Sequence, residues 1–345
     1  MRNDTRQAFN QLLSRLAHLS NVSSASESFT VEPSVQQTLE SKIQESSAFL
    51  GSINMIGVDE LKGQKLGLGV SGPIASRTDV TRKDRNTRDV SALETHDFEL
   101  LSTEFDTHIT WAKLDAWAKF PDFQTRVRNA IIRQQALDRI MIGFNGTHAA
   151  VETDRATNPM LQDVNIGWLE QYRQHAPART MSAGANTGEV RIGPGGDYAN
   201  LDALVFDVVN EMIDPWHRES TDIRAICGRR MLADKYFPLL QQYEQPTEQR
   251  ALDMIVSQQR MGGQQAARVP FMPDGTLLIT PPENLSLYWQ NGSRRRYLLD
   301  NPKRNRIENY ESSNDGYVVE DYGFGCLVEN IVFGDWKNAT GGASE

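Results

Sequence analysis

Two helical patterns separated by a serine-rich segment occupy the first 57 residues. Apolar residues spaced three to four apart predict a helix over residues 4–19. Ser20–Ser28 is too polar to form a core and is predicted to be a flexible linker. A second helix is predicted after Pro33, with Gly51 ending it. Its apolar positions are Val35, Leu39, Ile43 and Phe49. The first helix is predicted either to detach on its linker or to dock on the body, and both alternatives stay open.

Residues 58–100 have the pattern of a long polar β-excursion. Lys65–Val70 alternates apolar residues with glycine or polar residues, which is typical of a strand. A charged stretch over 77–89 follows, and it has too few apolar residues to pack on a core of its own. Its basic residues are Arg77, Arg82, Lys83, Arg85 and Arg88. Strand pattern resumes at Phe98 and continues to Trp111.

Residues 121–144 are predicted to form a helix of roughly seven turns, the most regular element of the chain. Pro121 suits the first helical position, and Asn145-Gly146 provides the stop. The residues expected to face the core are Phe123, Val127, Ile131, Gln134, Leu137, Met141 and Phe144, with Trp117 packing nearby.

The remaining elements are short. Helices are predicted at 163–174, 201–213 and 228–241. Strands are predicted at 190–192, 223–227, 254–257, 277–280, 285–288, 294–299, 306–310, 317–321 and 326–333. This order predicts an α+β protein whose last strands return to pack against the long helix.

Composition limits the choice of function. The chain of 345 residues carries a formal net charge of -9, whereas proteins that grip nucleic-acid phosphates usually present a basic surface. Cys227 and Cys326 are expected to be small buried hydrophobes in a reducing compartment. No apolar run approaches the ~20 residues that span a bilayer, and no signal-peptide pattern is present, so assembly in the cytoplasm without a membrane partner is expected.

Glycine motifs and histidines give weak support for catalysis. Gly67–Gly72 matches the dinucleotide pattern, but Pro73 and a charged stretch follow where the motif needs a helix. Gly193–Gly196 precedes a predicted helix without the lysine of a phosphate loop. No two of the six histidines are three or four residues apart. No catalytic, cofactor or metal site is therefore expected. An enzyme that binds a nucleotide at Gly67–Gly72 stays as a remote alternative, to be tested by nucleotide binding in a thermal-shift assay.

Arg294, Arg295 and Arg296 form the strongest basic cluster. The cluster is expected to contact either DNA phosphates or a neighbouring subunit through ion pairs. Strand geometry places Arg295 on the face opposite to the other two.

Long strings of the sequence resemble the major capsid proteins of P2-type (peduovirus) tailed bacteriophages. They are FTVEPSV at 29–35, QESS at 44–47, NAII at 129–132, NPMLQDV at 158–164, GWL at 167–169, GGDYA at 195–199, LADKYFP at 232–238, ENYES at 308–312 and VVEDY at 318–322. They keep their order over nearly the whole chain. Residues 77–93 depart from the pattern.

The resemblance implies the Hong Kong 97-type capsid fold and a division of the chain into segments. These would be a cleavable scaffold-side segment 1–29, an N-arm 30–57, an extended loop 58–100, a peripheral domain 101–196 and 283–335 with a spine helix 121–144, an axial domain 197–282 and a polar tail 336–345. Arg77, Arg82, Arg85 and Arg88 would then belong to an intersubunit loop.

The resemblance also implies the function. The chain would be a non-enzymatic subunit of an icosahedral phage head, forming pentamers and hexamers of a procapsid that matures by proteolysis. Cleavage is predicted between Phe29 and Thr30. The implied partners are further copies of the chain, a scaffold and protease, a portal protein and packaged double-stranded DNA bound without sequence specificity. An encapsulin-like compartment is the alternative on the same fold. It would lack the cleavable segment and carry enzyme cargo.

Overall fold

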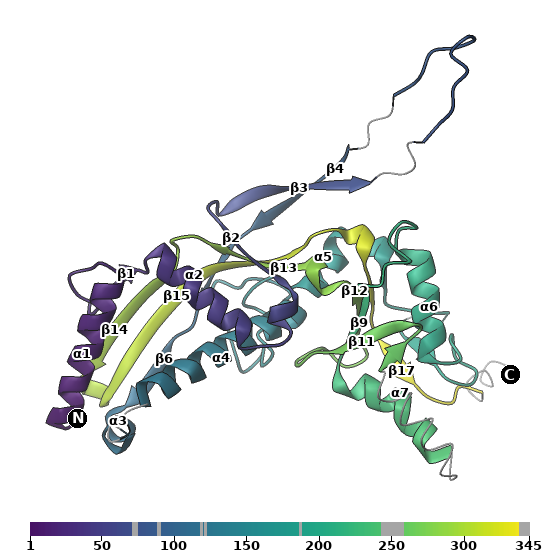
Figure 1. Cartoon of the computed structure of the whole chain (residues 1–345). Coiled ribbons are helices and arrows are strands. Elements are labelled where there is room, and N and C mark those ends of the chain that lie inside the picture. Colours follow the sequence, from purple (N-terminus) through teal and green to yellow (C-terminus); the bar gives the residue numbers. More distant parts are fainter. Residues whose placement is uncertain are drawn as a thin grey trace.

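The computed structural model describes residues 1–70, 75–87, 91–117, 120, 123–185, 188–242 and 259–337. Helices and strands are mixed along an elongated chain, with the N-terminal helix at one end, a lobe that carries α6 and α7 at the other, and a two-stranded hairpin leaving the middle (Figure 1). The protein is therefore α+β, as predicted. Short 3-10 helices occupy η1 (Leu50–Ser52), η2 (Pro177–Arg179), η3 (Pro282–Asn284), η4 (Pro302–Arg304) and η5 (Tyr322–Phe324).

A seven-stranded sheet, counted over the described ranges, forms the first lobe. Its path is β1 (Phe29–Thr30), β14 (Arg295–Asn301), β15 (Arg306–Val319), β13 (Leu285–Gln290) and β2 (Asn54–Val58), and β5 (Leu101–Glu104) and β6 (Thr107–Thr110) pair with β15. The sequence predicted two strands where β15 is one strand of 14 residues. The polar residues between the two predicted strands remain paired, because Ser312 to Asp315 bond to β5.

Helices pack around this sheet. They are α1 (Asn3–Leu19), α2 (Pro33–Glu45), α3 (Trp111–Trp117), α4 (Phe123–Asn145) and α5 (Trp168–His175). The helices predicted at 4–19 and after Pro33 are present, but the second stops at Glu45 and Phe49 lies beyond it. The helix predicted at 163–174 begins only at Trp168. Helix α3 was not predicted, because the strand pattern was expected to end at Trp111 and no element was assigned to the residues that follow it.

The long helix α4 is present, but its buried face differs from the predicted one. Ile131, Leu137 and Met141 are only half-buried and Gln134 is exposed. The buried positions are Ile132, Gln135, Ala136, Arg139, Ile140, Ile142, Gly143 and Phe144. The predicted face was rotated because two of the residues that point inward, Gln135 and Arg139, are polar. Pro121 and the side chains of Trp117 and Phe123 lie outside the described residues.

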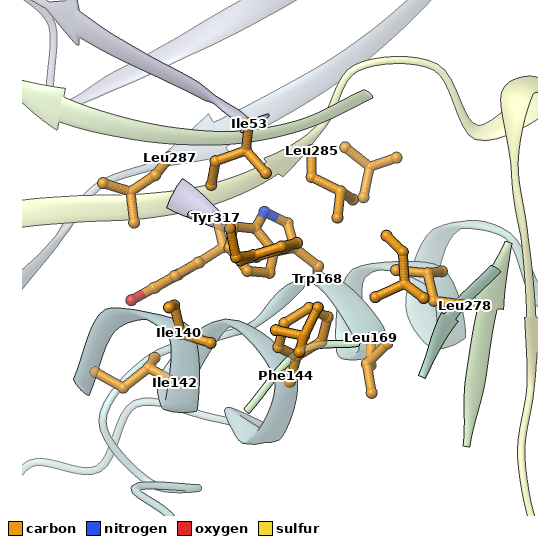
Figure 2. Close-up of a cluster of buried hydrophobic side chains, with 14 of the residues drawn as sticks. Ile53, Ile140, Ile142, Phe144, Trp168, Leu169, Leu278, Leu285, Leu287 and Tyr317 are labelled. Carbon is orange, nitrogen blue, oxygen red and sulfur yellow. The ribbon is translucent and has the colours of Figure 1, made fainter. Parts of the chain in front are cut away.

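Trp168 occupies the centre of the first core (Figure 2). Its side chain is fully buried, and its ring lies 5.4 Å from that of Phe144 and 5.1 Å from that of Tyr317, centroid to centroid. The indole nitrogen donates a hydrogen bond of 2.9 Å to the Ser286 carbonyl in β13. Trp168 therefore bonds α5 to the sheet and packs α5 against Phe144 of α4.

Gly143 permits this packing, and replacing it should destabilise the protein. A Cβ atom at this position would lie 2.2 Å from the Trp168 ring. Gly→Ala inside a helix ordinarily stabilises by ~0.5–1 kcal/mol. Here we expect Gly143→Ala to lower the free energy of unfolding by about 1–3 kcal/mol, because the ring must move out of a packed core. Urea denaturation of the unassembled chain measures this, and any gain in stability would contradict it.

A second sheet forms the other lobe, with six strands in the part of the chain that the structure describes. Its order is β10 (Arg260–Met261), β11 (Gln264–Arg268), β9 (Arg224–Cys227), β12 (Leu277–Thr280), β16 (Cys326–Val328) and β7 (Thr180–Met181). Helices α6 (Leu201–Met212) and α7 (Arg229–Gln242) contribute side chains to its core, and β8 (Val190–Ile192) pairs with β17 (Ile331–Phe333). Cys227 and Cys326 are free and buried in this core, as predicted. The strand predicted at 254–257 lies outside the described residues.

Asn284 clamps two of the chain segments that pass between the sheets. Its side-chain amide donates to the Asp321 carbonyl at 2.7 Å and to Thr280 Oγ1 at 2.9 Å, and its side-chain oxygen accepts from the Asp321 N–H at 2.7 Å. The connections from β12 to β13 and from β15 to β16 are thus held together.

The predicted β-excursion is a hairpin of β3 (Lys62–Val70) and β4 (Ser91–Glu99). The two strands pair antiparallel from Lys62 opposite Glu99 to Val70 opposite Ser91. The hairpin extends away from both lobes (Figure 1).

Candidate functional site

Five ionisable side chains form a buried network in the first lobe. Arg139 of α4 and Arg294, next to β14, are both 0% exposed. Three carboxylates surround them: Glu40 of α2, and Glu311 and Asp315 of β15, each 6% exposed or less. The network joins the helix that follows the N-terminal segment to the long helix and to the sheet.

Each guanidinium is held by more than one carboxylate. Arg139 Nε lies 3.0 Å from Asp315 Oδ2, and its Nη1 donates to Glu40 Oε2. Arg294 Nη1 lies 2.7 Å from Glu40 Oε1, and its Nε lies 2.8 Å from Glu311 Oε1. Gln135 of α4 accepts from Arg294 Nη2 at 2.8 Å and donates to Glu311 at 3.2 Å. Glu40 bridges the two arginines, so α2 cannot shift without breaking both sets of bonds.

Burial and charge act in opposite directions on these carboxylates. Burial alone would raise the pKa of Glu40, but the guanidinium groups of Arg139 and Arg294 outweigh it and hold the pKa below its ordinary value. The same balance, with Arg294 and Arg296 as the cations, lowers the pKa of Glu311. Burial dominates at Asp315 and raises its pKa, and the nearby Glu40 adds to the effect.

The network should weaken in acid. A lowered pKa in the folded state means that Glu311 stabilises the protein above its ordinary value of 4.5, and that this stabilisation is lost as the pH falls through the folded pKa. We expect the free energy of unfolding to fall below about pH 4.5, and to fall less steeply in Glu311→Gln. Urea midpoints measured from neutral to acidic pH test this. Parallel curves for the two proteins would contradict the prediction.

Arg294 is not part of a surface cluster, and the expectation that it contacts DNA or a neighbouring subunit must be corrected. Its side chain is satisfied inside its own chain by Glu40, Glu311 and Gln135. Arg295, one residue on, is exposed, as strand alternation requires. Arg296 is half-buried and donates from its Nε to Asn309 at 2.8 Å. Of the three predicted residues, Arg295 is the one that the fold leaves on the surface.

The N-terminal helix α1 is docked on its own chain. Phe9 packs with Leu298 and Ile307 of the sheet, and Ala17 lies in a cluster with Ala25, Phe29 and Val31. Arg6 forms an ion pair with Asp300 at 2.6 Å. The serine-rich segment is a series of turns in which Ala25 is only 1% exposed, and the Ala25 carbonyl accepts from the Leu298 N–H. It is more ordered than the flexible linker that the composition predicted.

The Phe29–Thr30 bond, predicted to be cleaved, lies in the two-residue strand β1. Phe29 pairs with Arg296 and Thr30 with Arg295 on β14, and the Val31 N–H donates to the Arg294 carbonyl at 2.8 Å. Phe29 is 7% exposed. A protease that binds extended chain cannot reach this bond while β1 stays on β14, which corrects the expectation of an open linker at this point.

The hairpin tip carries the predicted loop residues. Arg77, Arg82 and Arg85 are exposed, and Arg82 lies 3.5 Å from Asp79 in an exposed pair. Arg88 lies outside the described residues. Gly67 to Val70 are part of strand β3, and Ser71 and Gly72, the rest of the glycine motif, lie outside the described residues.

The described residues contain no cluster of three or more histidine, cysteine or acidic side chains that could hold a metal ion. No described helix is long and apolar enough to cross a bilayer.

The buried network is the feature that the sequence reasoning missed. A usable signal existed, because Gln36, Glu40 and Ile43 lie on one face of α2, and Gln135 and Arg139 lie one turn apart on α4. Both sets contain polar residues on faces that also carry apolar ones. None of the polar residues in these sets was predicted to be buried, because isolated charges are rarely buried.

Comparison with known proteins identifies the family. Residues 8–331 match the model of "Phage major capsid protein, P2 family". The chain is 50% identical to the capsid protein of Escherichia phage P2, over 100% of this chain and 99% of that protein, and 41% identical to the major capsid protein of Serratia phage KSP20, over 98% and 99%.

Solved structures agree with this assignment. A chain from the satellite phage P4 procapsid that includes the size determination protein superposes with a TM-score of 0.80 at 49% identity, covering 98% of this chain and 100% of that chain. A capsid chain of an empty GTA particle shares the fold alone, with a TM-score of 0.52 at 15% identity over 83% of this chain and 90% of that chain. The fold is therefore the Hong Kong 97-type capsid fold. The chain belongs to the P2 family of phage major capsid proteins, a family of structural capsid proteins and not of enzymes.

Proposed function

We propose that the chain assembles into pentamers and hexamers of an icosahedral procapsid, which matures by proteolysis and encloses double-stranded DNA. The observation that carries this proposal is the β3–β4 hairpin, which extends from the body with an exposed, charged tip (Figure 1). Among the described residues, only the base of the hairpin packs on its own chain, where the Phe98 ring contacts Tyr288 and Lys65 donates to the Val319 carbonyl. The exposed tip gains its burial from another copy. The relative from the P4 procapsid, 49% identical, supports assembly through a procapsid.

The segments take the roles that the sequence implied. Residues 1–29 are the removable segment, 30–57 the N-arm and 58–100 the loop that lies over a neighbouring subunit through Arg77, Arg82, Arg85 and Arg88. Residues 101–196 and 283–335 form the peripheral domain, 197–282 the axial domain and 336–345 a polar tail. Arg295 and Arg296 remain candidates for intersubunit contact, with Arg295 the more accessible of the two.

A scaffold and protease, a portal protein and packaged DNA complete the set of partners, and assembly takes place in the host cytoplasm. The net charge of -9 suits a wall that must not bind packaged DNA tightly. Relatives that match over the full chain are phage capsid proteins, which favours a phage head over an encapsulin-like compartment.

Electron microscopy of the chain expressed alone, and together with its scaffold and protease, tests the proposal. Closed shells with icosahedral symmetry are expected in the presence of the helper proteins. A chain that stays monomeric with its natural helpers would rule the proposal out, and shells that fill with enzyme cargo would favour the encapsulin-like alternative.

Mature chains are expected to begin at Thr30. The protease must first separate β1 from β14, since Phe29 is buried in the docked arrangement. Mass spectrometry of purified virions should find this new N-terminus, while procapsids made without the protease should retain Met1. Full-length chains in finished virions would overturn the assignment.

A further inference from the structure

Helix α1 is attached to the first lobe by a buried ring and an ion pair. Phe9 is only 8% exposed and packs with Leu298 and Ile307 of the sheet. Arg6 pairs with Asp300 at 2.6 Å, but its side chain is 45% exposed. An ion pair that water can reach contributes little, so the buried ring supplies most of the attachment.

The same helix also covers the segment that contains the predicted cleavage bond. Leu13 and Leu16 of α1 pack against a buried cluster that contains Phe29 and Val31. These two leucines also pack against the cluster around Phe9. Because the two clusters share side chains, α1 cannot leave the sheet without removing apolar cover from Phe29.

Backbone bonds hold β1 on β14 over a short length. The strand has two residues, Phe29 and Thr30, and lies at the end of the sheet path. A bond of 2.8 Å from the Val31 N–H to the Arg294 carbonyl continues the pairing. Pairing of this length is marginal in water unless side chains pack over it. The apolar cover that α1 provides is therefore the main barrier to separation of β1.

We propose that α1 is a latch that controls when the Phe29–Thr30 bond can be cut. While α1 is docked, Phe29 is buried and β1 is paired, so a protease cannot bind the bond as extended chain. When α1 undocks, the shared leucines leave with it, and the serine-rich segment behaves as the flexible linker that its composition favours. This inference rests on the proposed cleavage site and adds the step that regulates it.

Chymotrypsin, which cuts after aromatic residues, tests the latch on the unassembled full-length chain. Phe9→Ala removes the buried ring, and a new N-terminus at Thr30 should then form at least about tenfold faster, because the rate follows the open fraction. N-terminal labelling and mass spectrometry after short digestion measure this rate. Leu19→Ala is the matched control on the same helix, since that side chain is 48% exposed. Its rate should stay within about twofold of the wild-type rate.

A core variant distinguishes undocking of α1 from unfolding of the whole lobe. Trp168 belongs to a different cluster from Phe9 and Phe29, so Trp168→Phe weakens the first core and leaves the docking of α1 intact. It should speed cleavage after the buried Phe144 but keep cleavage at Thr30 within about twofold of the wild-type rate. A rise of less than about twofold in Phe9→Ala, or a rise at Thr30 in Trp168→Phe as large as that in Phe9→Ala, would overturn the latch.

A covalent lock should have the opposite effect. Arg6 and Asp300 are in contact and the native cysteines are buried, so Arg6→Cys/Asp300→Cys can be joined by a short bismaleimide. The joined chain should form the N-terminus at Thr30 at least about tenfold more slowly than the same variant before crosslinking. Equal rates before and after crosslinking would also overturn the latch.

These rates and the N-terminus of virion chains are independent measurements. Virion chains that begin elsewhere would remove Thr30 as the mature N-terminus and the latch from maturation, whatever the chymotrypsin rates. Virion chains that begin at Thr30, together with chymotrypsin rates that do not depend on α1, would remove the latch alone and leave the proposed cleavage in place.

Discussion

Arg294→Met is expected to lower the free energy of unfolding by about 3–5 kcal/mol. The side chain is fully buried and bonds to Glu40, Glu311 and Gln135. Methionine fills similar space but leaves Glu311 without this partner, and Glu40 keeps only Arg139. Removing one member of a buried ion pair is costly because the remaining charge stays out of water. Urea denaturation of the unassembled chain, followed by tryptophan fluorescence, measures the loss.

Arg295→Met is the matched control for this variant. The two arginines are adjacent in sequence, but Arg295 is exposed and points to the opposite face of the sheet. We expect a change of about 0.5 kcal/mol or less for an exposed position without such partners. Equal free energies of unfolding for the two variants would show that the buried ion pairs of Arg294 do not stabilise the fold.

The network also fixes how the N-arm lies on the long helix. Glu40 is the only one of the three carboxylates that comes from α2, and it contacts both arginines. A shift of α2 by one residue would remove Glu40 from the site and leave two buried cations with fewer partners. An apolar contact would tolerate such a slip far better, because it has no direction. Polar burial at this point therefore favours one register of α2.

Local patterns predicted much of the fold. The helices at 4–19 and 201–213 and the strands at 190–192 and 277–280 match the observed elements closely, since each carries a complete period of apolar residues bounded by a turn or polar signal. The β-excursion was predicted from the lack of any apolar face between residues 77 and 89. These elements are determined by residues that are close together in the sequence.

Features that depend on distant residues were not predictable in this way. The position of Arg294 is decided by Glu40, which is 254 residues away. The β1 pairing that buries Phe29 needs β14, and the serine-rich segment is ordered by contacts with β14 as well. Composition could indicate that residues 20–28 lack a core of their own, but not that another element supplies one.

Trp168→Ala is the second substitution with a large expected effect, a loss of about 3–5 kcal/mol in the free energy of unfolding. The indole is fully buried and lies beside Phe144 and Tyr317 (Figure 2). Its ring also contacts that of Phe49, and its nitrogen donates to the Ser286 carbonyl. Alanine leaves a cavity and removes the hydrogen-bond donor, and each change lowers the free energy of unfolding. Trp168→Phe should lose less, because it keeps one ring. Trp216→Ala is the control, since that ring is 47% exposed, and its expected loss is about 0.5 kcal/mol or less. If thermal and urea unfolding showed equal losses for Trp168→Ala and Trp216→Ala, the first core would not be organised around Trp168.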